Sequence, residues 1–226
     1  MQVFCADRFV ISIFLSKFVA MNETKWSENV ILADADYVDK VAFDLIVNFE
    51  RMLGRRIPPA DMARWLECVA LDGGLREKPQ TDGAAGDSQE IQVVLIHEKE
   101  SVAMNNFLPS DYASQLNGQA FRDHLGEFCI AAYPVEAVTT KEDFFLDVLQ
   151  TVGQQPEVKR LMVIHDAEHM HHQVASVLRH TDNDERRTTV FAMQPVEGGP
   201  FRQEILGYSL MAALGIRAEE ISNNTK

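Results

Sequence analysis

Carboxylate side chains stand directly after several short apolar runs of this sequence. Asp34 and Asp36 follow the run VILA, Glu98 follows IQVVLIH, and Asp166 and Glu168 follow LMVIH. Carboxylates gathered in one place repel one another at neutral pH, and a hard divalent cation with oxygen ligands relieves that repulsion. If these runs are strands that end at one edge of a sheet, the acids predict a site for Mg²⁺ or Mn²⁺. Such an ion activates water and stabilises the leaving oxygen in phosphodiester cleavage.

Two further acids are spaced to join this group, and each acid also has a simpler interpretation. Asp143 and Asp147 are one helical turn apart, so they can share a helix face. However, an Asp at the end of a strand is also an ordinary helix N-cap, which applies to Asp34 and Asp166. Asp143 suits the acidic first turn of its helix, and Glu98 suits a solvated loop. Both interpretations stay open for each of these residues.

Four of the seven histidines lie in the stretch VIHDAEHMHH, residues 163–172. Within it, His165 to His169 spells H-x-x-E-H, a zinc-protease pattern. That chemistry needs both histidines on one helix, whereas the preceding apolar run LMVI places His165 at the end of a strand. We therefore expect His165, His169 and His172 to be solvated groups near a helix start, with a transition-metal site as the alternative. The adjacent acids are the better functional candidates.

The charge balance limits the kinds of ligand that the chain can bind. The sequence has 34 Asp and Glu against 21 Lys and Arg, which gives a formal charge of −13 and a pI near 4.9. Nucleic-acid binding normally relies on a basic patch, although a bound metal ion supplies positive charge locally. The three cysteines are far apart and form no disulfide or metal-binding pattern. The patterns G-x-G-x-x-G, Walker A and G-x-S-x-G are absent from the sequence.

Apolar runs alternate with amphipathic segments along the chain, and this alternation predicts the fold. The predicted strands are 30–33, 91–96, 128–132, 161–164 and 188–193. The predicted helices are 38–53, 60–71, 110–125, 140–152, a segment that includes 174–178, and 201–214. Strands that alternate with helices favour right-handed crossovers and a parallel sheet covered on both faces. We therefore predict a Rossmann-like three-layer α/β/α sandwich with a mainly parallel sheet of about five strands. Functional groups should collect at the carboxyl ends of its strands, near the topological switch point.

The chain divides into one predicted domain with short appendages. Residues 28–216 form the α/β domain, the Gly-rich segment 72–89 is expected to be a mobile loop, and residues 217–226 a flexible C-terminal tail. Residues 1–27 are an N-terminal extension. Its apolar run, residues 9–15, is shorter than the roughly twenty residues that span a bilayer, and it lacks the marks of a signal peptide. We expect Met21 to be the initiator, in which case residues 1–20 are not translated. We expect a cytoplasmic protein without a membrane partner.

Two short motifs resemble the NYN/PIN-like nuclease domains. Asp34-Ala35-Asp36-Tyr37 is similar at its Asp to the Asp-x-x-Asn motif that ends the first strand in those families. Ile164-His165-Asp166-Ala167-Glu168-His169 keeps the acid-x-acid core of their later Ser-Gly-Asp-x-Asp-Phe-like turn. Tyr37 and His165 replace the Asn and Gly of the two motifs. The resemblance covers roughly residues 28–195.

The resemblance implies a metal-dependent domain that cleaves RNA or another phosphodiester substrate with Mg²⁺ or Mn²⁺. Asp34 and Asp166 would be the catalytic residues. The implied metal ligands are Asp34, Asp143, Asp147, Asp166 and Glu168.

The competing hypothesis is a non-catalytic α/β module that acts through a protein partner or by self-association. It rests on the acidic composition without a basic track and on the unusually apolar last predicted helix, Phe201 to Leu214.

Overall fold

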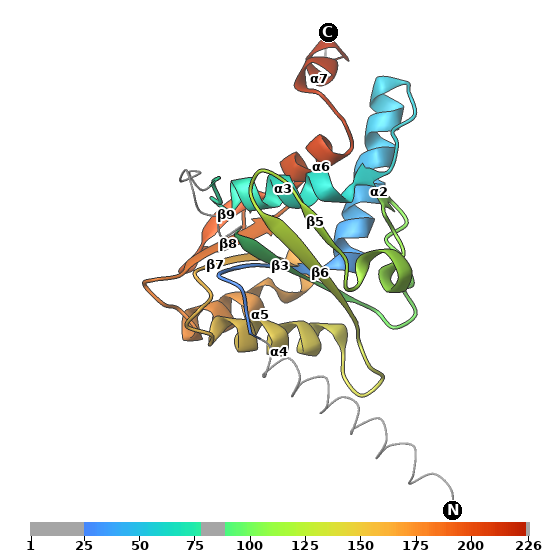
Figure 1. Ribbon diagram of the computed structural model, residues 1–226. Coiled ribbons are helices and arrows are strands. Elements are labelled where there is room, and N and C mark those ends of the chain that lie inside the picture. The colour runs from blue at the N-terminus through green and yellow to red at the C-terminus, as the bar shows by residue number, and fades with distance from the viewer. Residues whose placement is uncertain (1–24, 78–88, 225–226) are drawn as a thin grey trace, which may run out of the picture.

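The computed structural model describes residues 25–77 and 89–224, and its centre is a seven-stranded sheet (Figure 1). The strands lie in the order β5-β6-β3-β1-β7-β8-β9, and all neighbours are parallel except β5 and β6. In chain order they are β1 (Asn29–Asp34), β3 (Glu90–His97), β5 (Ala120–Arg122), β6 (Glu127–Pro134), β7 (Arg160–Ile164), β8 (Arg187–Ala192) and β9 (Arg202–Ile205). A separate two-stranded sheet pairs β2 (Ala60–Asp61) with β4 (Phe107–Leu108).

Helices cover both faces of the main sheet, so the predicted α/β fold with a mainly parallel sheet is confirmed. One apolar core joins the sheet to α2 (Ala35–Leu53), α3 (Met62–Asp72) and α6 (Leu206–Ala213). The other core joins the opposite face to α4 (Lys141–Gly153) and α5 (Ala167–His180). Figure 1 shows these two helical layers above and below the strands. The central strand β1 is buried along its whole length, which explains its unbroken apolar run.

The sheet has seven strands where about five were expected, and both additional strands lie at its edges. The segment predicted as a helix over 110–125 instead contains a short π-helix, η1 (Tyr112–Leu116), and the edge strand β5. The predicted helix over 201–214 begins as the other edge strand, β9, and becomes helical only at Leu206. The residues of β5 and β9 are exposed or half-buried. Short edge strands therefore lack the apolar run that marks a central strand.

The C-terminal tail was expected to be flexible, but it contains a helix. Residues Ala218–Asn224 form α7. Arg55, just after α2, binds Glu220 through two hydrogen bonds of 2.9 and 3.0 Å from Nε and Nη2 to the two carboxylate oxygens. This bidentate pair ties α7 to the end of α2.

Some expectations fall on residues outside the described ranges. Most of the expected mobile loop, at 78–88, and nearly all of the N-terminal extension, at 1–24, lie there. Across residues 25–77 and 89–224, no helix combines the length and the apolar character needed to cross a membrane.

The strand order reverses direction at β1. From β1 the chain builds outward through β3 to β6, and α4 then returns it to β7 on the other side of β1. The helices that follow β1 and β7 lie on opposite faces of the sheet, because α2 belongs to one core and α5 to the other. The carboxyl ends of β1 and β7 therefore form the topological switch point, where open α/β sheets place their ligands.

Candidate functional site

Asp34 is the last residue of β1 and is almost completely buried at the switch point. Its Oδ1 accepts a hydrogen bond of 3.0 Å from the backbone N–H of Tyr37, which makes Asp34 the N-cap of α2. The same oxygen accepts a hydrogen bond of 2.9 Å from the Nζ of Lys141. Asp34 is therefore both a helix cap and one half of an ion pair.

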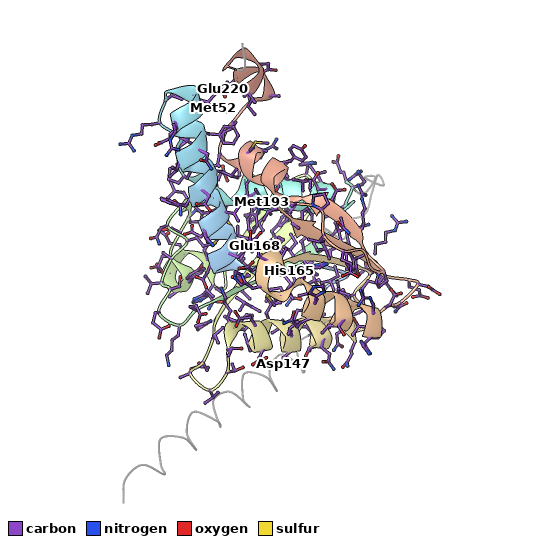
Figure 2. All side chains as sticks on the ribbon, turned by 180° about the vertical axis from the view of Figure 1, so that it is seen from behind. Met52, Asp147, His165, Glu168, Met193 and Glu220 are labelled. Atoms are coloured by element: carbon purple, nitrogen blue, oxygen red, sulfur yellow. The ribbon has the colours of Figure 1, made fainter. Side chains whose placement is uncertain are left out.

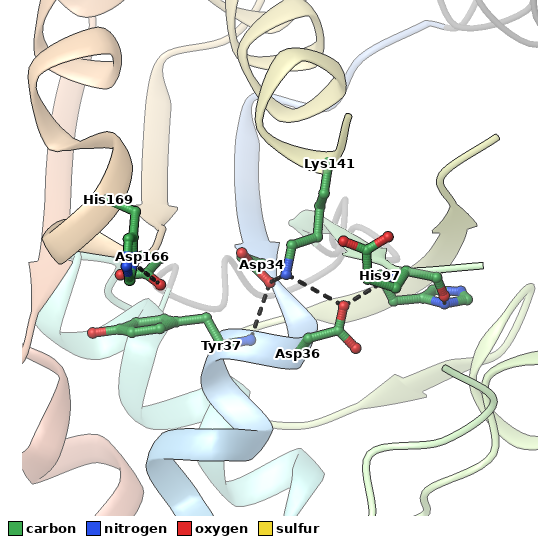
Figure 3. Close-up of polar contacts among 8 residues, drawn as sticks. Asp34, Asp36, Tyr37, His97, Lys141, Asp166 and His169 are labelled. Carbon is green, nitrogen blue, oxygen red and sulfur yellow. Dashed lines mark hydrogen bonds and ion pairs between the residues drawn. The ribbon is translucent and has the colours of Figure 1, made fainter. Parts of the chain in front are cut away.

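Lys141 joins Asp34 to a second carboxylate (Figure 3). Its Nζ lies 3.4 Å from Oδ2 of Asp36, and that oxygen also accepts a hydrogen bond of 2.7 Å from the backbone N–H of Glu98. Lys141 is the first residue of α4, directly after the N-cap Thr140. The ammonium group thus connects the end of β1, the start of α2, the end of β3 and the start of α4.

Burial and charge shift the pKa values of Asp34 and Lys141 in opposite directions. Burial raises the pKa of Asp34, and the neighbouring Lys141 opposes that rise. Burial alone would lower the pKa of Lys141, but Asp34 and Asp36 together raise it. The carboxylate has the larger desolvation cost because its side chain is 3% exposed, against 15% for Lys141. An incompletely compensated carboxylate in a buried position is typical of functional sites.

Asp166 lies at the end of the neighbouring strand and has its own partners. It caps α5 by accepting a hydrogen bond of 3.1 Å from the backbone N–H of Glu168, and its Oδ2 lies 2.8 Å from Nδ1 of the exposed His169. Figure 3 shows the ring of Tyr37 pointing from the start of α2 toward Asp166 and His169. Burial raises the pKa of Tyr37 to about 12, with further contributions from Asp166, Glu168 and Asp34. The structure therefore places Asp34 and Asp166 at the carboxyl ends of adjacent strands, and the charges of both act on Tyr37.

The other predicted metal ligands do not join the Asp34–Lys141–Asp36 group. Asp143 and Asp147 are on the exposed side of α4, and Figure 2 shows Asp147 below Glu168 and His165. Burial raises the pKa of Asp147, and the charge of Asp143 adds to the rise, as expected of residues on one helix face.

Within the described residues, one group of three side chains has the spacing of metal ligands, and it does not include the acids of the switch point. It consists of Glu67, Asp123 and His124, whose ligand atoms lie within 4.8 Å of one another. The five acids predicted as metal ligands therefore do not form a single cluster.

The histidines differ in burial, which corrects one prediction. His165 was expected to be solvated, but it is fully buried, and its Nε2 lies 3.2 Å from Nδ1 of His171. His171 Nε2 lies 2.9 Å from the backbone oxygen of Glu197. Because a carbonyl only accepts, His171 donates from Nε2, so its Nδ1 accepts from His165. His169 and His172, by contrast, are exposed as predicted.

Sequence reasoning missed Lys141 and Tyr37 as members of this site. A signal for Lys141 was present, because a cation in the first turn of a helix opposes the helix dipole and is unfavourable without a compensating anion. Tyr37 carried no comparable signal.

The comparisons with known proteins identify the family of this chain. Residues 23–221 match the model of a family of unknown function, DUF6621. The chain belongs to this family. No curated protein and no solved structure matches the chain.

Proposed function

We propose that this DUF6621 domain cleaves phosphodiesters with a divalent cation held by Asp34 and Asp36. One observation carries the proposal: oxygens of these two carboxylates approach a single point, which the ammonium group of Lys141 takes in this structure. That point lies at the carboxyl edge of a parallel sheet beside its switch point, the usual ligand position in such folds. A place that holds an ammonium ion between two carboxylates suits a cation.

The residues fit a magnesium-like ion in number and kind. Mg²⁺ typically uses one or two protein carboxylates and completes its shell with water and substrate phosphate oxygens, so Asp34 and Asp36 suffice. Lys141 competes for the same oxygens, and the site binds a cation only when the ammonium moves away. The ion, when bound, neutralises the substrate phosphate and activates water.

Asp166 and His169 have a second role in this proposal. Their contact of 2.8 Å is a carboxylate–imidazole pair at the neighbouring strand end. Asp166 orients the ring of His169, and the exposed imidazole takes a proton from the attacking water. RNA or another phosphodiester is the proposed substrate class, in line with the NYN/PIN-like motifs.

Calorimetric titration with Mn²⁺ tests the cation site. The wild type should bind Mn²⁺, Asp34→Asn should lose binding, and Lys141→Met should bind more tightly because the competing ammonium is gone. Asp143→Asn removes an exposed acid from α4 and serves as the matched control, with unchanged affinity. Absence of Mn²⁺ binding in both the wild type and Lys141→Met would refute the proposal.

Cleavage of a single-stranded RNA oligonucleotide in Mn²⁺ tests the activity. Asp34→Asn should abolish cleavage, and Asp166→Asn should reduce it while leaving Mn²⁺ affinity largely intact. Cleavage that survives both substitutions would assign the activity to a contaminant.

A second candidate function is the non-catalytic module, and the same ion pair supports it. Lys141 already compensates Asp34 and Asp36, and both Asp34 and Asp166 cap helices. The apolar face of α6 is mostly buried within the domain, and only Tyr208 is a large exposed hydrophobic residue on it. Self-association through α6 would then depend on Tyr208. Light scattering on wild type and Tyr208→Ser tests this alternative, which requires a dimer that the substitution dissociates.

A further inference from the structure

The opposite, amino-terminal edge of the sheet carries a concentration of arginines in this acidic protein. A cavity of about 280 Å³ lies there between the end of α3 and the starts of β7, β8 and β9. The residues that line it include Gly74, Arg160, Arg187, Thr188, Phe201 and Arg202. It is separate from the site at the carboxyl edge.

Two of these arginines are neighbours on adjacent strands. Arg160 and Arg187 are partners in the parallel register of β7 and β8, so their backbones are about 4.8 Å apart and their side chains leave the same face. Like charges in directly opposed positions of a sheet are destabilising. Burial lowers the pKa of Arg160, and the charges of Arg187 and Arg76 lower it further. The pairing of Arg160 with Arg187 therefore has an electrostatic cost.

Hydrogen bonds within the protein use only some of the N–H donors of these two guanidinium groups. Arg160 donates from Nη1 to the backbone oxygen of Gly73 at 3.1 Å, a favourable contact at the C-terminus of α3. Its Nε is shielded from solvent and has no hydrogen-bond partner in the described part of the chain. The guanidinium of Arg187 likewise makes no ion pair or hydrogen bond with any described residue.

The remaining arginines at this edge are already compensated. Arg202 forms an ion pair with Glu204, and Asp72 also acts on Arg202. Arg186 donates to four backbone carbonyls around the neighbouring turn, including that of Val158 at 3.0 Å. Arg76 donates to the backbone oxygens of Leu71 and Leu75. Arg160 and Arg187 therefore have the least compensated guanidinium groups at this edge.

We infer that this cavity binds the phosphate group of a small molecule between Arg160 and Arg187. Guanidinium groups match phosphate oxygens with paired hydrogen bonds, and an anion between the two side chains removes their mutual repulsion. Gly73, Gly74 and Pro200 also line the cavity and leave an uncharged wall for an organic group attached to the phosphate. At 280 Å³ the cavity suits a ligand no larger than a mononucleotide.

Calorimetric titrations of the full chain with inorganic phosphate and with adenosine monophosphate test this inference, using chloride at equal ionic strength as the blank. Phosphate and adenosine monophosphate should each bind at one site. Tighter binding of the nucleotide would show that the organic group is recognised, and equal affinity would show that the phosphate alone is. Arg187→Gln should weaken binding about ten- to hundredfold, because one charge-assisted contact is lost.

The choice of variants separates binding from folding. Arg187 is exposed and has no described partner, so Arg187→Gln should keep the stability of the wild type. Arg51→Gln, on the exposed side of α2, removes the same charge elsewhere and should leave the affinity unchanged. Titrations without heat for both ligands, or equal affinities in Arg187→Gln and wild type, would overturn the inference. These results do not depend on divalent cations or on RNA cleavage.

Discussion

Replacing Lys141 by Met tests whether the ion pair at the switch point stabilises the fold. The substitution keeps a long unbranched side chain and removes the ammonium group that binds Asp34 at 2.9 Å and Asp36 at 3.4 Å. Asp34 would remain buried without a counterion. Breaking a buried ion pair from one side typically costs 3–5 kcal/mol. Because Lys141 is 15% exposed, we expect a loss of about 3 kcal/mol in the free energy of unfolding at pH 8.

The stability lost in Lys141→Met should depend on pH. Without the ammonium group, burial acts on Asp34 with less opposition and raises its pKa further. A carboxyl group whose folded pKa lies above its unfolded pKa favours the folded state as it takes up a proton. The deficit of Lys141→Met relative to the wild type should therefore shrink as the pH falls from 8 toward 4.

Urea unfolding curves of four proteins at several pH values measure these effects. Asn at position 34 still caps α2 but carries no charge, so Asp34→Asn/Lys141→Met should recover most of the stability lost in Lys141→Met. Lys99→Met is the control, because Lys99 is 56% exposed and lies 3.6 Å from Glu136, and such surface pairs contribute at most about 1 kcal/mol. A Lys141→Met deficit below about 1 kcal/mol, or one that does not change with pH, would refute the reasoning.

Two further predictions concern the folded core. The backbone of Gly126 has φ +150°, and a Cβ there would lie 2.1 Å from the backbone oxygen of Gln89, so Gly126→Ala should destabilise the protein by about 2 kcal/mol or more in urea unfolding. Gly198→Ala, where nothing lies within 4 Å of the added carbon, should be nearly neutral, and equal effects at the two positions would contradict the steric argument. Burial, with a smaller contribution from His171, lowers the pKa of His165 to about 3. The unfolded chain then binds an extra proton below pH 6.5, so stability should fall by about 2 kcal/mol between pH 7 and pH 5. His165→Gln should flatten this slope in unfolding curves recorded at each pH, and an unchanged slope would show that His165 is not its source.

The central elements of the fold could be predicted because their environment determines their sequence pattern. β1 is buried at every residue and β7 at all but its first, so each carries an unbroken apolar run. α2 has one buried side, which produces its helical spacing of apolar residues. The edge strands β5 and β9 are half-exposed and short, and neither condition leaves a distinctive pattern. The C-terminal helix α7 is tied to α2 by the contact of Glu220 with Arg55, which lies 165 residues away.

The acids of the switch point could be predicted for a similar reason. The carboxyl ends of parallel strands lie at the same edge of a sheet. Once β1 and β7 were recognised as parallel strands of one sheet, Asp34 and Asp166 had to lie at that edge. Whether two strands are neighbours depends on the crossovers, and the pairing of β1 with β7 appears only in the structure. The contact between Asp34 and Lys141 spans 107 residues, and no local pattern specifies which charge meets which at such separation.

The position of Lys141 connects the stability of this fold to the proposed cation chemistry. Any cation that binds Asp34 and Asp36 must first displace an ammonium group whose interaction we place at about 3 kcal/mol. A competition of that size weakens cation binding about a hundredfold, since about 1.4 kcal/mol corresponds to a factor of ten. Lys141→Met should therefore lose stability and gain Mn²⁺ affinity by matching amounts at pH 8. Because Lys141 begins α4, displacement of its ammonium group also acts on the start of that helix, so cation binding and the position of α4 should change together. A variant that loses stability without any gain in Mn²⁺ affinity would leave Lys141 with a structural role alone.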